Sequence, residues 1–108
     1  MANTFKSAVA QIANSNAADV YTASSSAGSQ TVIHAVYITN KHSSAVNVDL
    51  MVRKSSTDYY VTKGAPIPAG STLTLDKPVN LETSNKLKIK SSNSSGLLDI
   101  FVSILEIT

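Results

Sequence analysis

The sequence of 108 residues contains no cysteine and no tryptophan, and aromatic residues make up only 6% of it. Without cysteine, the chain forms neither a disulfide framework nor a thiolate metal site, and it has no cysteine nucleophile. The absence also fits assembly in a reducing cytosol. The shortage of aromatic rings counts against a carbohydrate-binding site, because ligand pockets usually rely on hydrophobic and aromatic side chains.

Charge and long hydrophobic runs are scarce as well. Nine basic and seven acidic residues give a net charge of +2, which is too small to predict a nucleic-acid partner. No stretch approaches the roughly 20 apolar residues of a transmembrane helix. The apolar start of the chain is interrupted by Ser7 and Gln11, so it does not resemble a signal peptide. We therefore expect neither nucleic acid nor a membrane among its partners.

What the sequence does contain is strand-like alternation, most clearly between Thr31 and Arg53. From Val46 to Arg53 every second residue is apolar, which predicts a strand with one buried and one hydrated face. Leu50 is then expected in the core and Met51 on the hydrated face. The preceding arm, Val32–Ile38, is apolar on both faces except at His34, which predicts a central strand.

Further strands are predicted at 58–62, 71–75, 86–90 and 97–107, separated by turns about every ten residues. Pro66 and Pro68 exclude 63–70 from a central position, because proline lacks the N–H that a ladder needs. Of the adjacent Tyr59 and Tyr60, one is expected in the core and the other in solvent. The predicted fold is all-β: a single antiparallel β-sandwich of seven to eight strands, either jelly-roll or immunoglobulin-like.

The N-terminal segment, residues 1–13, is predicted to be an arm or edge strand attached to a sandwich domain of residues 14–108. Its periodicity fits neither strand nor helix well, yet Phe5, Val9 and Ile12 need burial. We expect the segment to pair or pack across a subunit boundary. The alternative is a first strand that closes its own sheet.

The sequence contains no recognisable catalytic, cofactor-binding or metal-binding constellation. The two histidines, His34 and His42, lack the three or four convergent ligands of a zinc site. Asp49 and Asp99 could face each other on neighbouring strands, but outward charges that keep strands soluble are the simpler interpretation. Neither a G-x-S-x-G elbow nor a glycine-rich phosphate loop occurs. We expect no enzyme activity, no cofactor and no small-molecule substrate.

Lys86, Lys88 and Lys90 line one face of a predicted strand, at intervals of roughly 6–7 Å. They could form a basic ridge that docks on an acidic partner. Alternatively, they protect a sheet edge from aggregation, which is a common function of edge lysines.

Several segments together carry a resemblance to a known family: ANTFKSAVA, DVYTA, TVIHAVYITN, SSAVNVDLMV, APIPAGSTLTL, LETSNKLKIKSS and LDIFVSILEIT. In these motifs the chain resembles the small β-sandwich virion structural proteins of tailed bacteriophages, particularly those of marine and cyanobacterial phages. The likeness covers nearly the whole chain, and its motifs are structural, so no catalytic residue is transferred.

The resemblance implies a non-enzymatic virion structural protein that is assembled in the host cytoplasm. Capsid decoration or cement is the expected role, with a neck, tail or fibre component as the alternative. Apart from the resemblance, a host-surface or carbohydrate-binding module is a further alternative, because β-sandwiches commonly serve in this way. The expected partners are copies of the chain itself, for example in a trimer, and virion proteins such as the major capsid protein. Apolar residues left outside the core would serve these contacts, and the candidates beyond the N-terminal segment are Tyr37, Met51, Phe101, Leu105 and Ile107.

Overall fold

The computed structural model describes residues 3–12, 15–26, 28–92 and 98–107, which contain nine β-strands. No helix that could cross a membrane occurs in these ranges. In chain order the strands are β1 (Asn3–Ile12), β2 (Ala18–Thr22), β3 (Gln30–Asn40), β4 (Val46–Lys54), β5 (Thr57–Ile67), β6 (Thr72–Leu75), β7 (Val79–Leu81), β8 (Lys86–Ser91) and β9 (Leu98–Ile107).

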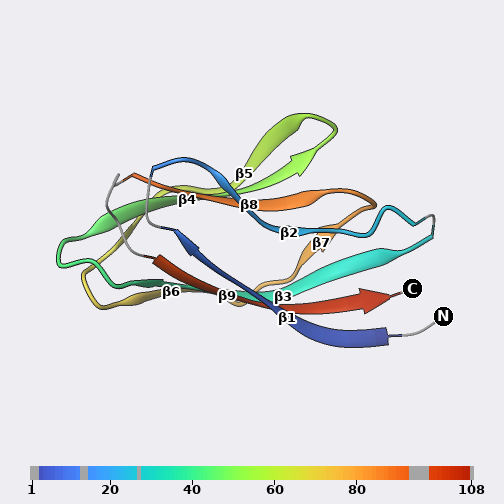
Figure 1. The fold of residues 1–108 in the computed structure, drawn as a ribbon, viewed down its shortest axis with the longest axis horizontal. Helices are drawn as coiled ribbons and strands as arrows, with labels where there is room; N and C mark the ends of the chain where they lie inside the picture. Colours follow the sequence, from blue (N-terminus) through green and yellow to red (C-terminus); the bar gives the residue numbers. More distant parts are fainter. Residues whose placement is uncertain (1–2, 13–14, 27, 93–97, 108) are drawn as a thin grey trace.

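The strands form two antiparallel sheets, which Figure 1 shows as two layers, one above the other. The five-stranded sheet, called sheet A, has the order β1-β9-β3-β6, and β7 also pairs with β3. The four-stranded sheet, called sheet B, has the order β2-β8-β4-β5. The start of β1 and the end of β9 lie side by side at one end of the sandwich (Figure 1), where Asn3 pairs with Ile107.

The pairing is that of a jelly roll. β4 pairs with β5, β3 with β6 and β7, β2 with β8, and β1 with β9. These nested pairs alternate between the two sheets, as in jelly rolls built from two Greek keys. The predicted sandwich is therefore confirmed, with the jelly-roll order rather than the immunoglobulin order. The strand count exceeds the predicted seven to eight because β6 and β7 share one edge of β3.

Alternation along the strands places one apolar face of each sheet in the core between the layers. Leu98, Ile100, Val102 and Ile104 of β9 are all buried, as their spacing predicts. β3 lies between β9 and the β6/β7 edge, so its predicted central position is also confirmed. Leu50 of β4 is completely buried in the same core.

Met51 departs from the sequence prediction. It does face away from the core, but only 3% of its surface is exposed. Its neighbours in register are Lys88 on one side and Tyr60 on the other. Long side chains such as these cover apolar surface with their stems and rings. The outer face of sheet B therefore buries a methionine of its own, which alternation along one strand does not predict.

β5 continues to Ile67, through the segment that the prolines excluded from a central strand. The strand lies at the edge of sheet B, where Pro66 removes no essential ladder bond. Gly64 has a positive φ of 66°, and its N–H donates to Asp49 Oδ1 at 2.7 Å. This places a glycine bulge where the register with β4 shifts. Tyr59 and Tyr60 are both exposed, by 58% and 50%, so the prediction that one of them lies in the core is wrong. As an edge strand, β5 has a neighbouring strand on one side only.

β1 is hydrogen-bonded along its whole length to β9 of the same chain. It forms one edge of sheet A, and its only fully buried residue is Ile12. The predicted boundary between Ala13 and Asn14 falls outside the described residues.

Candidate interaction surfaces

The outer face of sheet A carries a row of three large apolar side chains on three adjacent strands. Val9 on β1 lies opposite Phe101 on β9, which in turn lies opposite Tyr37 on β3. The ring centroids of Tyr37 and Phe101 are 6.3 Å apart, with a tilt of 52°, within the range of favourable aromatic pairs. Val9 is 70% exposed, Phe101 47% and Tyr37 39%. This row therefore presents apolar surface to solvent.

A second apolar row crosses the same three strands. Phe5 on β1 lies opposite Leu105 on β9, and Leu105 lies opposite Val32 on β3. Phe5 is 76% exposed, and the other two are half-buried. The position between the rows is occupied by Ser7 and Ser103, whose short side chains introduce no charge. We call the two rows together the apolar face: Phe5, Val9, Val32, Tyr37, Phe101 and Leu105.

An open hollow of about 560 Å³ lies beside the first row, lined by Val9, Tyr37 and Phe101 and, at its polar end, by Asp99. Gln11 Nε2 donates to Asp99 Oδ1 at 3.0 Å, and Lys41 Nζ lies 2.9 Å from the same oxygen. Lys41, and after it Gln11, lower the pKa of the Asp99 carboxyl below its usual value. The Asp99 carboxylate is therefore ionised at neutral pH, beside the positive charge of Lys41. This carboxylate forms the polar boundary of the hollow.

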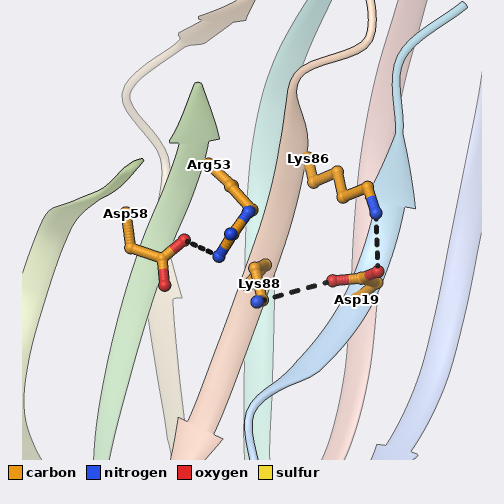
Figure 2. Close-up of polar contacts among 5 residues, drawn as sticks. All are labelled: Asp19, Arg53, Asp58, Lys86 and Lys88. Atoms are coloured by element: carbon orange, nitrogen blue, oxygen red, sulfur yellow. Dashed lines mark hydrogen bonds and ion pairs between the residues drawn. The ribbon is translucent and has the colours of Figure 1, made fainter. Parts of the chain in front are cut away.

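The outer face of sheet B differs from the apolar face in carrying a network of charges (Figure 2). Lys86 Nζ lies 3.3 Å from Asp19 Oδ2, and Lys88 Nζ lies 3.9 Å from Asp19 Oδ1. Arg53 Nη1 donates to Asp58 Oδ1 at 3.2 Å. These residues come from all four strands of sheet B. Exposed pairs of this kind add little stability, but they keep this face hydrated.

The lysines of β8 do not protect an edge. β8 lies between β2 and β4, so the edge-protection interpretation of Lys86, Lys88 and Lys90 is wrong. Two of the three share Asp19 as a counter-ion. Lys90 is exposed and lies opposite Asp49 in the ladder. A basic ridge is thus present, but acidic neighbours offset its charge.

The six residues predicted for an interface do not form one surface. Phe5 and Val9 lie on the apolar face, whereas Ile12 is 4% exposed and packs in the core of its own chain. The three lysines lie on the outer face of the other sheet. Sequence reasoning identified Tyr37, Phe101 and Leu105 as surplus apolar residues. It missed Val32, whose outward position depends on the irregularity that displaces His34 from the ladder.

The histidines and carboxylates do not assemble into a metal site. No group of three or more potential ligands comes together within the described ranges. His34 is exposed, at the point where the register of β3 shifts. His42 lies in the β3–β4 turn, where its Nδ1 accepts a hydrogen bond from the Ser44 N–H at 3.1 Å. His34 is thus an exposed strand residue, and His42 is a hydrogen-bonded turn residue.

Tyr59 and Tyr60 do not form a common platform for a sugar. They are consecutive in the β4–β5 ladder, so their side chains point to opposite faces of the strand. Lys63 Nζ lies 4.5 Å from the ring centroid of Tyr60, and the nearby Asp58 is paired with Arg53. The geometry needed to stack a sugar ring beside a free carboxylate is therefore not present at these residues.

Comparison with known proteins supports the fold assignment. No protein-family model matches the chain, and no curated protein matches it in sequence. A chain in the acid-stable capsid structure of Helicobacter pylori bacteriophage KHP30 superposes with a TM-score of 0.69 and 11% identity, covering 99% of this chain and 98% of that one. A chain from the disulfide-linked pili of Bacillus endospore appendages gives a TM-score of 0.63 and 13% identity, covering 98% of this chain and 88% of that one. At such low identity, these similarities show a shared fold and no more: the described residues of the present chain are folded like these two chains.

Proposed function

We propose that this chain is a non-enzymatic structural protein of a bacteriophage virion and serves as a capsid decoration or cement component. The fold that it shares with a phage capsid chain covers almost the full length of both. Fold alone does not determine function, so the proposal rests mainly on the apolar face. Soluble monomers rarely leave large contiguous apolar patches in water, and such patches commonly mark protein contacts.

The apolar face belongs to a surface large enough for a stable contact. Figure 1 looks along the shortest axis of the molecule, whose extents are 45, 26 and 19 Å, and shows the two sheets stacked across the 26 Å direction, so the side of the molecule that contains the apolar face spans at most about 45 by 19 Å, turns included. A standard protein interface buries about 800 Å² on each partner, which such a face can supply. The charged outer face of sheet B is suited to the opposite position, towards solvent. We propose that sheet A faces the capsid shell.

A neck, tail or fibre component is the second candidate. The fold is shared by a chain from the pili of Bacillus endospore appendages, so the same jelly roll also occurs in a filament. Those pili are linked by disulfides, and the present chain contains no cysteine. A filament built from it would therefore need non-covalent contacts, for which the apolar face is equally suited.

The proposed contact is tested by co-sedimentation of the purified protein with shells of the major capsid protein encoded in the same genome. Phe101→Lys places a charge at the centre of the apolar face and is expected to reduce binding at least tenfold. Asn47→Lys adds the same charge at an exposed position on sheet B and serves as the matched control. Binding through the apolar face should persist at about 1 M salt, where the Debye length is only about 3 Å.

Two outcomes would count against this proposal. If Phe101→Lys folds, as judged by its thermal melt, and binds shells like the unmodified protein, the apolar face is not the contact. If binding disappears at high salt and is lost on charge reversal of Lys86, Lys88 and Lys90, the basic ridge docks instead.

A further inference from the structure

The four edges of the two sheets are not protected alike. An unprotected edge strand exposes unpaired N–H and C=O groups and can pair with another chain. In sheet B, β2 is only five residues long and its register with β8 shifts, while β5 contains Pro66, a glycine bulge and further register shifts. The β6/β7 edge of sheet A consists of strands of four and three residues. These three edges are short or irregular, which discourages pairing.

β1 is the exception. It is ten residues long, contains neither proline nor glycine, and keeps one continuous register with β9 from Asn3 to Ile12. Its outward side chains include Phe5 and Val9, both of which are mostly exposed. Among the strands that the structure describes, β1 is thus the long, regular and apolar edge.

We propose that β1 pairs antiparallel with β1 of a second copy of this chain, with Ser7 of the two copies facing each other on a two-fold axis. In this register Phe5 of one copy lies opposite Val9 of the other, on both sides of the axis. Aromatic residues opposite β-branched residues are favourable cross-strand pairs. The edge is therefore complementary to itself, which is what a two-fold interface requires.

The position of Lys6 favours the register centred on Ser7 over the neighbouring registers of the β1–β1 pair. Its side chain faces the inner side of sheet A, where Lys6 Nζ lies 3.4 Å from Glu106 Oε2. A register centred on Lys6 would place two lysines directly opposite each other, which destabilises a strand pair. A register centred on Ala8 would set Phe5 against the polar Gln11. With Ser7 on the axis, Lys6 lies opposite the small Ala8 of the other copy, and its charge remains paired with Glu106.

Pairing of this kind would join the two copies of sheet A into one continuous sheet. The apolar faces would then meet along β1, so that Val9 and Phe101 of one copy continue into Phe5 of the next. This arrangement leaves β1 in its own sheet rather than exchanging it, and it gives a dimer rather than a trimer. It concerns the chain's own association and holds whether or not the further partner is a capsid shell.

The register is tested by oxidative cross-linking. The chain contains no cysteine, so Ser7→Cys introduces a single thiol at an exposed position. Residues opposite each other in an antiparallel pair have Cα atoms about 4.5–5.5 Å apart, which is within reach of a disulfide. Val9→Cys is the matched control, because its two copies would be displaced by four residues, or about 13 Å. We expect Ser7→Cys to form a covalent dimer at least ten times faster than Val9→Cys.

The association itself is measured by sedimentation equilibrium, where a dimer has twice the 11.4 kDa mass of the chain. Ser7→Lys sets two charges opposite each other on the axis and is expected to weaken dimerisation at least tenfold. Thr74→Lys adds a charge at an exposed position on the other edge of sheet A and should leave the dimer intact. A chain that remains monomeric at about 0.2 mM, a trimer, or equal cross-linking of the two cysteine variants would each overturn the proposed pairing.

Discussion

At the scale of single residues, Asn40 links three parts of the chain at the end of β3. It is fully buried, and its Nδ2 donates to the carbonyl oxygens of Ser44 and Ile67, both at 2.9 Å. Its Oδ1 accepts from the His42 N–H at 2.8 Å. We expect Asn40→Ala to lower the free energy of unfolding by about 2–4 kcal/mol, because buried polar groups lose their partners. Urea denaturation measures this loss. Asn47→Ala, at an exposed position, should change stability by less than about 0.5 kcal/mol, and equal losses would show that the Asn40 contacts are not stabilising.

Tyr21 provides a pH-dependent link between the sheets. Its hydroxyl, on β2, donates to Glu106 on β9. Burial, and after it the hydrogen bond to Glu106, raise the pKa of Tyr21 above its usual 10.0. A raised pKa means that the folded state holds the proton more tightly than the unfolded state. Its stabilisation is thus fully present below pH 10 and is lost as the pH rises through the pKa of the folded state.

We therefore expect Tyr21→Phe to cost about 1–2 kcal/mol at pH 8, and we expect its difference from the unmodified protein to shrink above pH 10. Denaturant titrations at a series of pH values measure both effects. Tyr59→Phe removes a hydroxyl from an exposed ring and should cost nothing at either pH. A Tyr21→Phe deficit that stays constant up to pH 12 would contradict this assignment of the bond.

At the scale of elements, the apolar residues of β1 lie on both of its faces, one in the core and one exposed to solvent. Ile12 packs in the core, whereas Val9 is 70% exposed on the apolar face. We expect Ile12→Ala to destabilise the monomer by about 2–5 kcal/mol, and Val9→Ala by less than about 0.5 kcal/mol. Thermal melts at low protein concentration separate the two variants. If Val9→Ala lowers the free energy of unfolding as much as Ile12→Ala does, the face of β1 that carries Val9 is buried, and the assignment of the two faces is wrong.

Some strands could be predicted from the sequence and others could not, and the difference lies in how strongly the neighbouring strands fix the buried face. In β4 from Val46 to Val52, in β8 from Leu87 to Ile89 and in β9 from Leu98 to Ile104, every second residue is apolar and packs in the core. Both neighbouring strands and the opposite sheet fix which face of these strands is buried. β1 has only one neighbouring strand, and its inward positions hold small or polar residues such as Thr4, Lys6 and Ala8. A burial pattern this weak also fits other conformations. The continuation of β5 was missed because the glycine bulge at Gly64 carries the strand past the point where its pattern breaks.

The candidate surface was predictable only in part. Surplus apolar residues such as Phe5, Val9 and Phe101 can be found in the sequence, because they fall on the face opposite the core residues. Their assembly into rows depends on which strands pair and in what register, and the β1–β9 and β9–β3 pairings join segments far apart in the chain. The lysines illustrate the same limit. Their alternation predicted a common face, but not that β8 would lie inside its sheet.

At the scale of the whole molecule, the jelly roll gives the protein two unlike outer surfaces. Sheet A presents the apolar face, whereas sheet B presents charges that are largely paired with each other, and its exposed apolar side chains, Tyr59, Tyr60 and Val61, lie on the edge strand β5. A protein that only needed to stay soluble would benefit from charge on both sheets. The asymmetry is instead what a component needs when one side is covered by an assembly and the other remains in water.

A cryo-electron microscopy map of the assembled phage particle tests this function most directly. We predict density for the jelly roll on the outside of the capsid, with Tyr37 and Phe101 of sheet A against the shell and the lysines of β8 facing solvent. Density for this chain in the neck, tail or fibre would replace decoration by the second candidate function. A capsid-bound jelly roll with sheet B on the shell and the apolar face in water would contradict the central claim.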